Sequence, residues 1–73
     1  LKFIIRLKEI NMPIKQIQYY SKLRYDGDDT IKERLELLEE QMDRLNIEKR
    51  KIEENIIHLN KKISIYKKMI DKK

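Results

Sequence analysis

The sequence predicts an all-α fold, in which two short helices precede one long helix that pairs with a second copy as an antiparallel coiled-coil homodimer. Three observations predict it. Charged residues make up 42% of the 73 residues, with one glycine and one proline, a composition typical of helical chains. Apolar residues recur at alternating steps of four and three between Ile31 and Ile70. No glycine or proline interrupts residues 30–73, so a folded-back hairpin is not expected there.

Residues 1–25 predict a pair of short helices. The apolar face of the first carries Leu1, Phe3, Ile4, Leu7 and Ile10. Asn11 tolerates the left-handed conformation and can end this helix. Pro13 suits the first position of the second helix, because its missing N–H is not needed there. This helix then extends to about Arg24, and its apolar side carries Ile14, Ile17, Tyr20 and Leu23.

A polar linker at residues 26–29, which reads Asp-Gly-Asp-Asp, separates the helix pair from the long helix. Thr30 and Glu33 match a capping box, in which Thr30 bonds the amide of Glu33 and Glu33 reaches back to Thr30. Asp28 and Asp29 add negative charge at the positive end of the long helix dipole. We therefore expect the long helix to begin at residue 30.

The repeating positions of the long helix form the predicted dimer interface, which we name the seam. They are Ile31, Leu35, Leu38, Met42, Leu45, Lys49, Ile52, Ile56, Leu59, Ile63, Tyr66 and Ile70. In heptad notation Leu35 and every seventh residue after it take position a, and the remaining seam residues take position d. A helix of about 40 residues is roughly 60 Å long. Nothing else in so short a chain can cover a stripe of that length, so a partner helix must cover it.

In an antiparallel pair, each seam residue of one helix meets a seam residue of the partner. With a two-fold axis between residues 50 and 51, every position a meets a position d of the partner, and Leu35 faces the partner's Tyr66. The acidic stretch 33–40 then lies beside the partner's basic stretch 61–68. A parallel pair would instead place Lys49 against its own copy. Lys49 either fixes the register of the pair or extends its ammonium group along the surface to water, and the sequence leaves both open.

The sequence gives little support for catalysis or for metal binding. His58 is the single histidine and takes a solvent-facing heptad position. The acids of residues 26–29 lack the ligand pattern of a calcium loop, and capping explains them better. The chain has no cysteine, so thiolate metal sites and disulfides are excluded. We predict no enzyme activity, no metal and no cofactor.

Localisation is predicted from hydropathy and from the start of the chain. No apolar run is long enough to span a membrane and no signal peptide is visible, so we expect a cytoplasmic protein with no membrane partner. The chain opens with Leu1 inside an amphipathic pattern, so we expect an upstream segment.

Basic and aromatic residues alternate in the second helix, where Lys15, Tyr19, Tyr20, Lys22, Arg24 and Tyr25 lie close in sequence. Such residues can stack on and clamp nucleic acid. They also serve as amphipathic packing residues between helices, and we favour that interpretation.

One weak anion site is predicted where the first short helix gives way to the second. It consists of Lys8 and of the free amides around Met12 and Ile14 at the start of the second helix. These groups suffice for one contact to a nucleic-acid backbone phosphate. They do not suffice to read bases.

Two stretches resemble the MerR family of bacterial transcription regulators. Residues 1–17, with LKFIIRLK followed by NMPIKQI, are similar to the family pattern LxFIxxLKxxGMxLxxI, with Asn11 at the family's glycine. Residues 23–38, LRYDGDDTIKERLELL, look like the family's junction into its dimerisation helix. Together with the long helix, the resemblance covers essentially the whole chain.

The resemblance implies a role in transcription. In that family a winged helix-turn-helix reads promoter DNA, two short helices form its second wing, and the long helix pairs antiparallel. This chain would supply the dimerisation helix and part of one wing, with Lys8 as the retained phosphate contact. Promoter DNA is then a partner of the full-length protein, and the effector stays unidentified. The family's effector cysteines are missing here.

A generic antiparallel coiled-coil scaffold, or an arm that docks RNA, remains an alternative with no link to transcription. The residues encoded just upstream of Leu1 discriminate between the two. A helix-turn-helix pattern there favours the regulator, whereas further heptads or a catalytic domain favour the scaffold.

Overall fold

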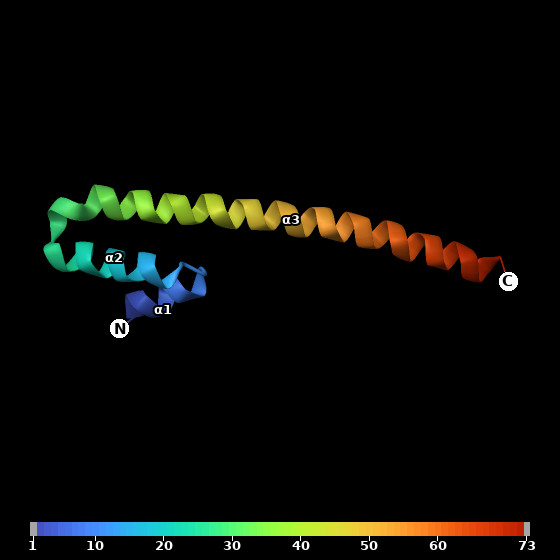
Figure 1. Ribbon diagram of the computed structural model, residues 1–73, viewed down its shortest axis with the longest axis horizontal. Coiled ribbons are helices and arrows are strands. Elements are labelled where there is room, and N and C mark those ends of the chain that lie inside the picture. Colours follow the sequence, from blue (N-terminus) through green and yellow to red (C-terminus); the bar gives the residue numbers. More distant parts are fainter. Residues whose placement is uncertain (1, 73) are drawn as a thin grey trace.

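The structure, a computed structural model, describes residues 2–72 and is helical almost throughout (Figure 1). Its elements are α1 (Lys2–Glu9), α2 (Ile14–Asp26), the 3-10 turn η1 (Asp28–Thr30) and α3 (Ile31–Asp71). No strand occurs among residues 2–72. The prediction of an all-α chain with one long, unbroken C-terminal helix is confirmed. Leu1, predicted on the apolar face of the first helix, lies outside the described residues.

The molecule is a rod with a thickened end (Figure 1). Its principal extents are 68 × 21 × 15 Å. Helix α2 runs antiparallel along the N-terminal half of α3, and α1 packs against α2. The C-terminal half of α3 projects beyond both short helices, so no part of the described chain covers it.

Asn11 ends α1 as the sequence predicts. Its φ of 59° is left-handed, and its N–H donates to the carbonyl oxygen of Lys8 at 3.0 Å. The N–H of Met12 donates to the carbonyl oxygen of Leu7 at 3.1 Å. These two bonds form a Schellman closure, and the apolar contact that accompanies such a closure is supplied by Leu7 and Met12, which are both buried.

Helix α2 begins one residue later than predicted. Pro13 has ψ of 144°, which is extended, and therefore precedes the helix instead of opening it. Its carbonyl oxygen accepts hydrogen bonds from the amides of Gln16, at 2.9 Å, and Ile17, at 3.0 Å. The extended ψ of Pro13 turns the chain from α1 into α2. Ile14, predicted on the apolar side, is consequently exposed at the first turn.

A small apolar core joins the two short helices. Leu7, Met12 and Ile17 are buried at its centre, and the half-buried side chains around them are Phe3, Ile4, Ile10 and Tyr20. Leu23 of α2 and Leu37 of α3 are buried where those two helices meet. The predicted apolar faces of the short helices therefore form the core, apart from Ile14.

The predicted capping box is wrong. Thr30 has φ of −101° and ψ of 5°, outside the extended conformation that an N-cap side chain needs, because η1 tightens the entrance to α3. Its hydroxyl lies 2.5 Å from the carbonyl oxygen of Leu23 and 2.7 Å from that of Gly27, so it donates back into the preceding turn. The carboxylate of Glu33 instead accepts a hydrogen bond from the hydroxyl of Tyr19 at 3.1 Å.

The linker between the short helices and α3 is shorter than the predicted residues 26–29. Asp26 closes α2, and Asp28 and Asp29 belong to η1. Gly27 alone lies outside a helical element, with φ of 104°, and its N–H donates to the carbonyl oxygen of Leu23 at 3.3 Å. One glycine therefore reverses the chain direction between α2 and α3.

Candidate dimerisation surface

The N-terminal half of α3 has two faces in different environments, one packed against the short helices and one open. One face carries Leu37 and Gln41, which are buried against the short helices, and the half-buried Arg34 and Arg44. In heptad notation these residues take positions c and g. The other face carries positions a and d, the seam. Because the short helices cover only the first face, the seam is left open beside them.

A polar cluster fastens the turn between α1 and α2 to α3. The Gln41 side chain donates from Nε2 to the carbonyl oxygen of Ile10 at 2.7 Å. Arg44 donates from Nε to Oε1 of Gln41 at 3.0 Å and from Nη2 to Oε1 of Gln16 at 2.5 Å. We name Ile10, Gln16, Gln41 and Arg44 the polar clasp. Sequence reasoning missed it, because Gln41 and Arg44 occupy heptad positions that an isolated coiled coil exposes.

The seam is exposed along almost its whole length. Leu45 is half-buried and Lys49 is exposed. The other seam side chains, all of them apolar or aromatic, are exposed by 37% at Leu38 up to 70% at Ile70. A fully buried side chain of this kind contributes about 1.5–3 kcal/mol relative to an exposed one. Coverage of the seam by a partner would therefore release a large free energy.

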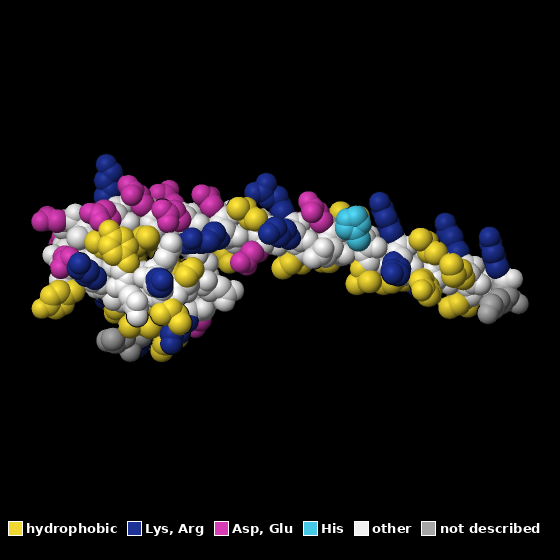
Figure 2. All heavy atoms as spheres, viewed as in Figure 1, with side chains coloured by type: hydrophobic (Ala, Val, Ile, Leu, Met, Phe, Trp, Pro, Cys, Tyr) yellow, Lys and Arg dark blue, Asp and Glu magenta, His cyan; other side chains and the backbone are white. Residues whose placement is uncertain are grey.

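Charge is segregated along α3 (Figure 2). Acidic side chains gather over its N-terminal half, which faces the upper edge of the view. Along the C-terminal half, lysines project from one edge and apolar side chains line the other. Residues 33–40 hold four glutamates and residues 61–68 hold four lysines. These two stretches of the helix are thus oppositely charged.

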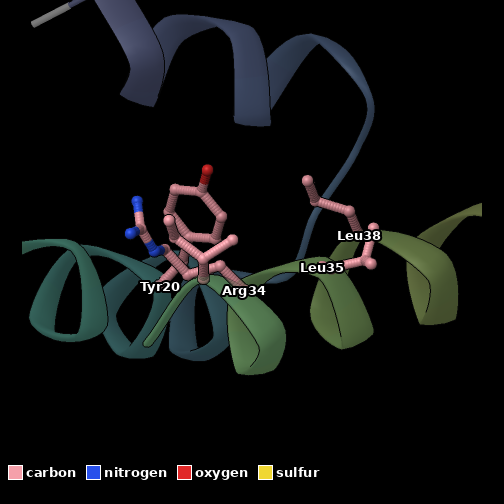
Figure 3. Close-up of a pocket in the computed structure, with 5 residues that line it drawn as sticks. Tyr20, Arg34, Leu35 and Leu38 are labelled. Carbon is pink, nitrogen blue, oxygen red and sulfur yellow. The ribbon is translucent and has the colours of Figure 1, made fainter. Parts of the chain in front are cut away.

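A groove lies between α2 and the seam (Figure 3). Its volume is about 270 Å³. Its lining residues are Tyr20, Ile31, Arg34, Leu35 and Leu38. Arg34 donates from Nη2 to the carbonyl oxygen of Gly27 at 3.3 Å, whereas its Nε is buried without an acceptor. The groove is therefore lined mainly by apolar side chains, beside the arginine that joins α3 to Gly27.

No family model, curated protein or solved structure matches this chain.

The three tyrosines of α2 have three different environments. Tyr20 packs against Phe3 with ring centroids 6.3 Å apart and an interplanar angle of 37°, so the packing interpretation is confirmed for Tyr20. The guanidinium carbon of Arg24 lies over the Phe3 ring, 4.1 Å from the ring centroid, as a cation–π contact. Tyr25 is exposed, so packing within the chain does not explain it.

Tyr19 contacts Glu33 across the α2–α3 interface. The hydrogen bond from its hydroxyl to the Glu33 carboxylate raises the pKa of Tyr19 above the ordinary 10.0. The negative charge of Glu33 acts in the same direction, because it opposes formation of a second anion. This tyrosine is therefore a contact residue of the fold.

The predicted anion site is only partly available. The Met12 amide donates to the carbonyl oxygen of Leu7 within the Schellman closure, and its side chain is buried. The expectation that this amide is free is therefore wrong. Lys8 is exposed at the end of α1, and Ile14 opens α2 with an exposed side chain. An anion at this position could contact only the Lys8 ammonium and amides of the first turn of α2.

His58 and the acidic residues of the chain form no metal-binding cluster within residues 2–72. His58 is exposed, as its heptad position predicts. The described residues contain no cluster of three or more histidines, cysteines, aspartates or glutamates able to hold a metal ion. Within the same residues, every helix is too short or too polar to cross a membrane.

Proposed function

We propose that this chain is the dimerisation region of a MerR-type DNA-binding transcription regulator, and that it forms a homodimer through the seam. The exposed seam is the observation that carries the proposal. The short helices reach α3 only as far as Arg44 through the polar clasp, and an apolar stripe continues for another 26 residues to Ile70. A helix with such a stripe gains stability chiefly by packing against a second helix.

Antiparallel pairing is supported by charge and by the position of Lys49. A parallel pair lays the acidic half of α3 beside its own copy and does the same with the basic half. An antiparallel pair lays residues 33–40 beside the partner's residues 61–68, which are oppositely charged. It also moves Lys49, which is exposed here, opposite the partner's Ile52 and away from a second lysine.

The link to transcription rests on the resemblance of residues 1–38 to the MerR family. In the proposed dimer, the two pairs of short helices lie at opposite ends of the coiled coil and are related by a two-fold axis. Such symmetry suits a DNA site with two similar halves. Lys8 and the first turn of α2 would contribute phosphate contacts, which position a protein on DNA without reading its sequence.

Disulfide cross-linking tests the dimer and its direction, because the chain has no cysteine of its own. Chains with Leu35→Cys are mixed with chains carrying Tyr66→Cys and oxidised. An antiparallel dimer gives the mixed disulfide, whereas Leu35→Cys alone stays reduced. A parallel dimer gives the reverse result. A chain that sediments as a monomer at tens of micromolar refutes the proposal altogether.

DNA binding tests the transcriptional part separately. The isolated chain should bind duplex DNA weakly and without sequence preference, and about 0.2 M salt should abolish the binding, because phosphate contacts release counterions. A charge-reversed Lys8→Glu variant should bind more weakly than a Lys51→Glu control, because Lys51 is exposed beside the two-fold axis, far from both pairs of short helices. Equal binding by the two variants would contradict a phosphate contact at Lys8.

A further inference from the structure

The C-terminal half of α3 carries exposed apolar side chains that do not belong to the seam. Among them, Ile65 takes heptad position c and Met69 takes position g. Positions c and g define the flank of α3 that, in its N-terminal half, packs against α2. Within residues 2–72, no element of the same chain covers this flank beyond Arg44. Its apolar residues near the C-terminus therefore need a separate explanation.

The proposed dimer places this flank beside the groove. In an antiparallel pair the g positions of both helices lie on the same side of the coiled coil. The register set by the seam pairs Leu35 with the partner's Tyr66 and Ile31 with the partner's Ile70. The partner's Met69 therefore lies between these two layers, on the side where α2 covers α3. Arg34, at position g, is its nearest neighbour on the first helix.

We infer that the groove between α2 and α3 is filled by the last turns of the partner's α3, with the partner's Met69 packed between Tyr20 and the stem of Arg34. This inference rests on the proposed dimer. The partner's Tyr66 and Ile70 close the seam side of the groove, and the partner's Ile65 continues the contact along α2. Each short-helix pair is thereby held by both chains.

A second copy suits this groove because the two surfaces that meet are both apolar. The lining is apolar at Tyr20, Ile31, Leu35 and Leu38, and the incoming segment is apolar on the matching flank. Ile31, Leu35 and Leu38 belong to the seam as well as to the groove, so the helix that covers the seam also reaches the groove.

Cysteine cross-linking at the groove tests the inference. Chains with Tyr20→Cys are mixed with chains carrying Met69→Cys, and the rate of mixed disulfide formation is compared with that of Tyr19→Cys plus Met69→Cys. Tyr19 is the matched control, because its hydroxyl bonds Glu33 on the far side of the interface from the groove. The expected result is a much faster disulfide from position 20 than from position 19.

The Leu35→Cys and Tyr66→Cys pair, measured alongside, separates the two proposals. If that pair cross-links while positions 20 and 19 react equally slowly, the groove inference is wrong and the dimer stands. If neither pair cross-links, both proposals fail.

Charge insertion gives a second measurement. Met69→Lys should raise the dimer Kd by about tenfold, because it removes a buried apolar contact. Ile57→Lys is the control, since Ile57 is 55% exposed in the single chain and Met69 is 56% exposed, but Ile57 takes position b and points away from both the seam and α2. Equal Kd values for the two variants would overturn the placement of Met69.

Discussion

Gln41 donates a hydrogen bond from Nε2 to the carbonyl oxygen of Ile10, 2.7 Å away, although the two residues are 31 positions apart in the chain. The Gln41 side chain is only 3% exposed, and its Oε1 accepts from Arg44. The turn between α1 and α2 is thereby fixed to α3 by a buried polar contact. This contact orients the short helices with respect to the seam.

Removal of this contact should loosen the short helices. Gln41→Ala removes the donor from the half-buried Ile10 carbonyl oxygen, so we expect a loss of about 1 kcal/mol in the free energy of unfolding. Urea unfolding followed by circular dichroism measures it. Glu40→Ala, at the exposed neighbouring position, should stay within about 0.5 kcal/mol of the parent chain. Similar values for the two variants would show that the polar clasp contributes nothing.

A charge in the seam should dissociate the dimer. Ile56 and Ile57 are adjacent, and in the single chain they are 52% and 55% exposed. Ile56 takes position a of the seam and Ile57 takes position b. Ile56→Glu should therefore sediment as a monomer at tens of micromolar, whereas Ile57→Glu should remain a dimer. The two side chains are almost equally exposed in the single chain, so burial within the chain gives no reason for the two variants to differ. If both variants sediment in the same state, the seam is not the interface.

Substitution of Gly27 should destabilise the fold because of the local backbone conformation alone. Its φ of 104° and ψ of −164° belong to a region that residues with a Cβ rarely adopt. No atom lies within 4 Å of the position that a Cβ would take, so no clash with a neighbouring element is involved. Gly27→Ala should destabilise the fold by about 1–3 kcal/mol in urea unfolding. Asn60→Ala, in the exposed part of α3, should not destabilise it.

Alkaline pH should weaken the contact between Tyr19 and Glu33. The folded-state pKa of Tyr19 is raised, so its protonated form is favoured by folding. This contribution is fully present below the unfolded pKa, about 10, and it is lost as the pH rises through the folded pKa. Glu33→Gln should lower the pKa of Tyr19, seen as earlier phenolate absorbance. The control introduces Glu33→Gln into a chain that carries Tyr19→Phe, where the pH dependence of the phenolate absorbance should not change. A change in that titration would show that the effect belongs to another tyrosine.

Periodicity along the chain predicted the helices correctly, because helices depend on local geometry. A helix places residues three and four apart on one face, whatever surrounds it. The single glycine and the single proline lie in or beside the turns, and Asn11 has the left-handed φ expected of it. The absence of breakers after Gly27 likewise predicted one unbroken helix from Ile31 to Asp71.

The flank of α3 that the short helices occupy was decided by tertiary packing. Leu37 and Gln41 are buried although their heptad positions predict exposure, and Arg44 is half-buried beside them. These outcomes depend on contacts between residues far apart in the chain. A pattern within one helix carries no information on which neighbour will cover its second face.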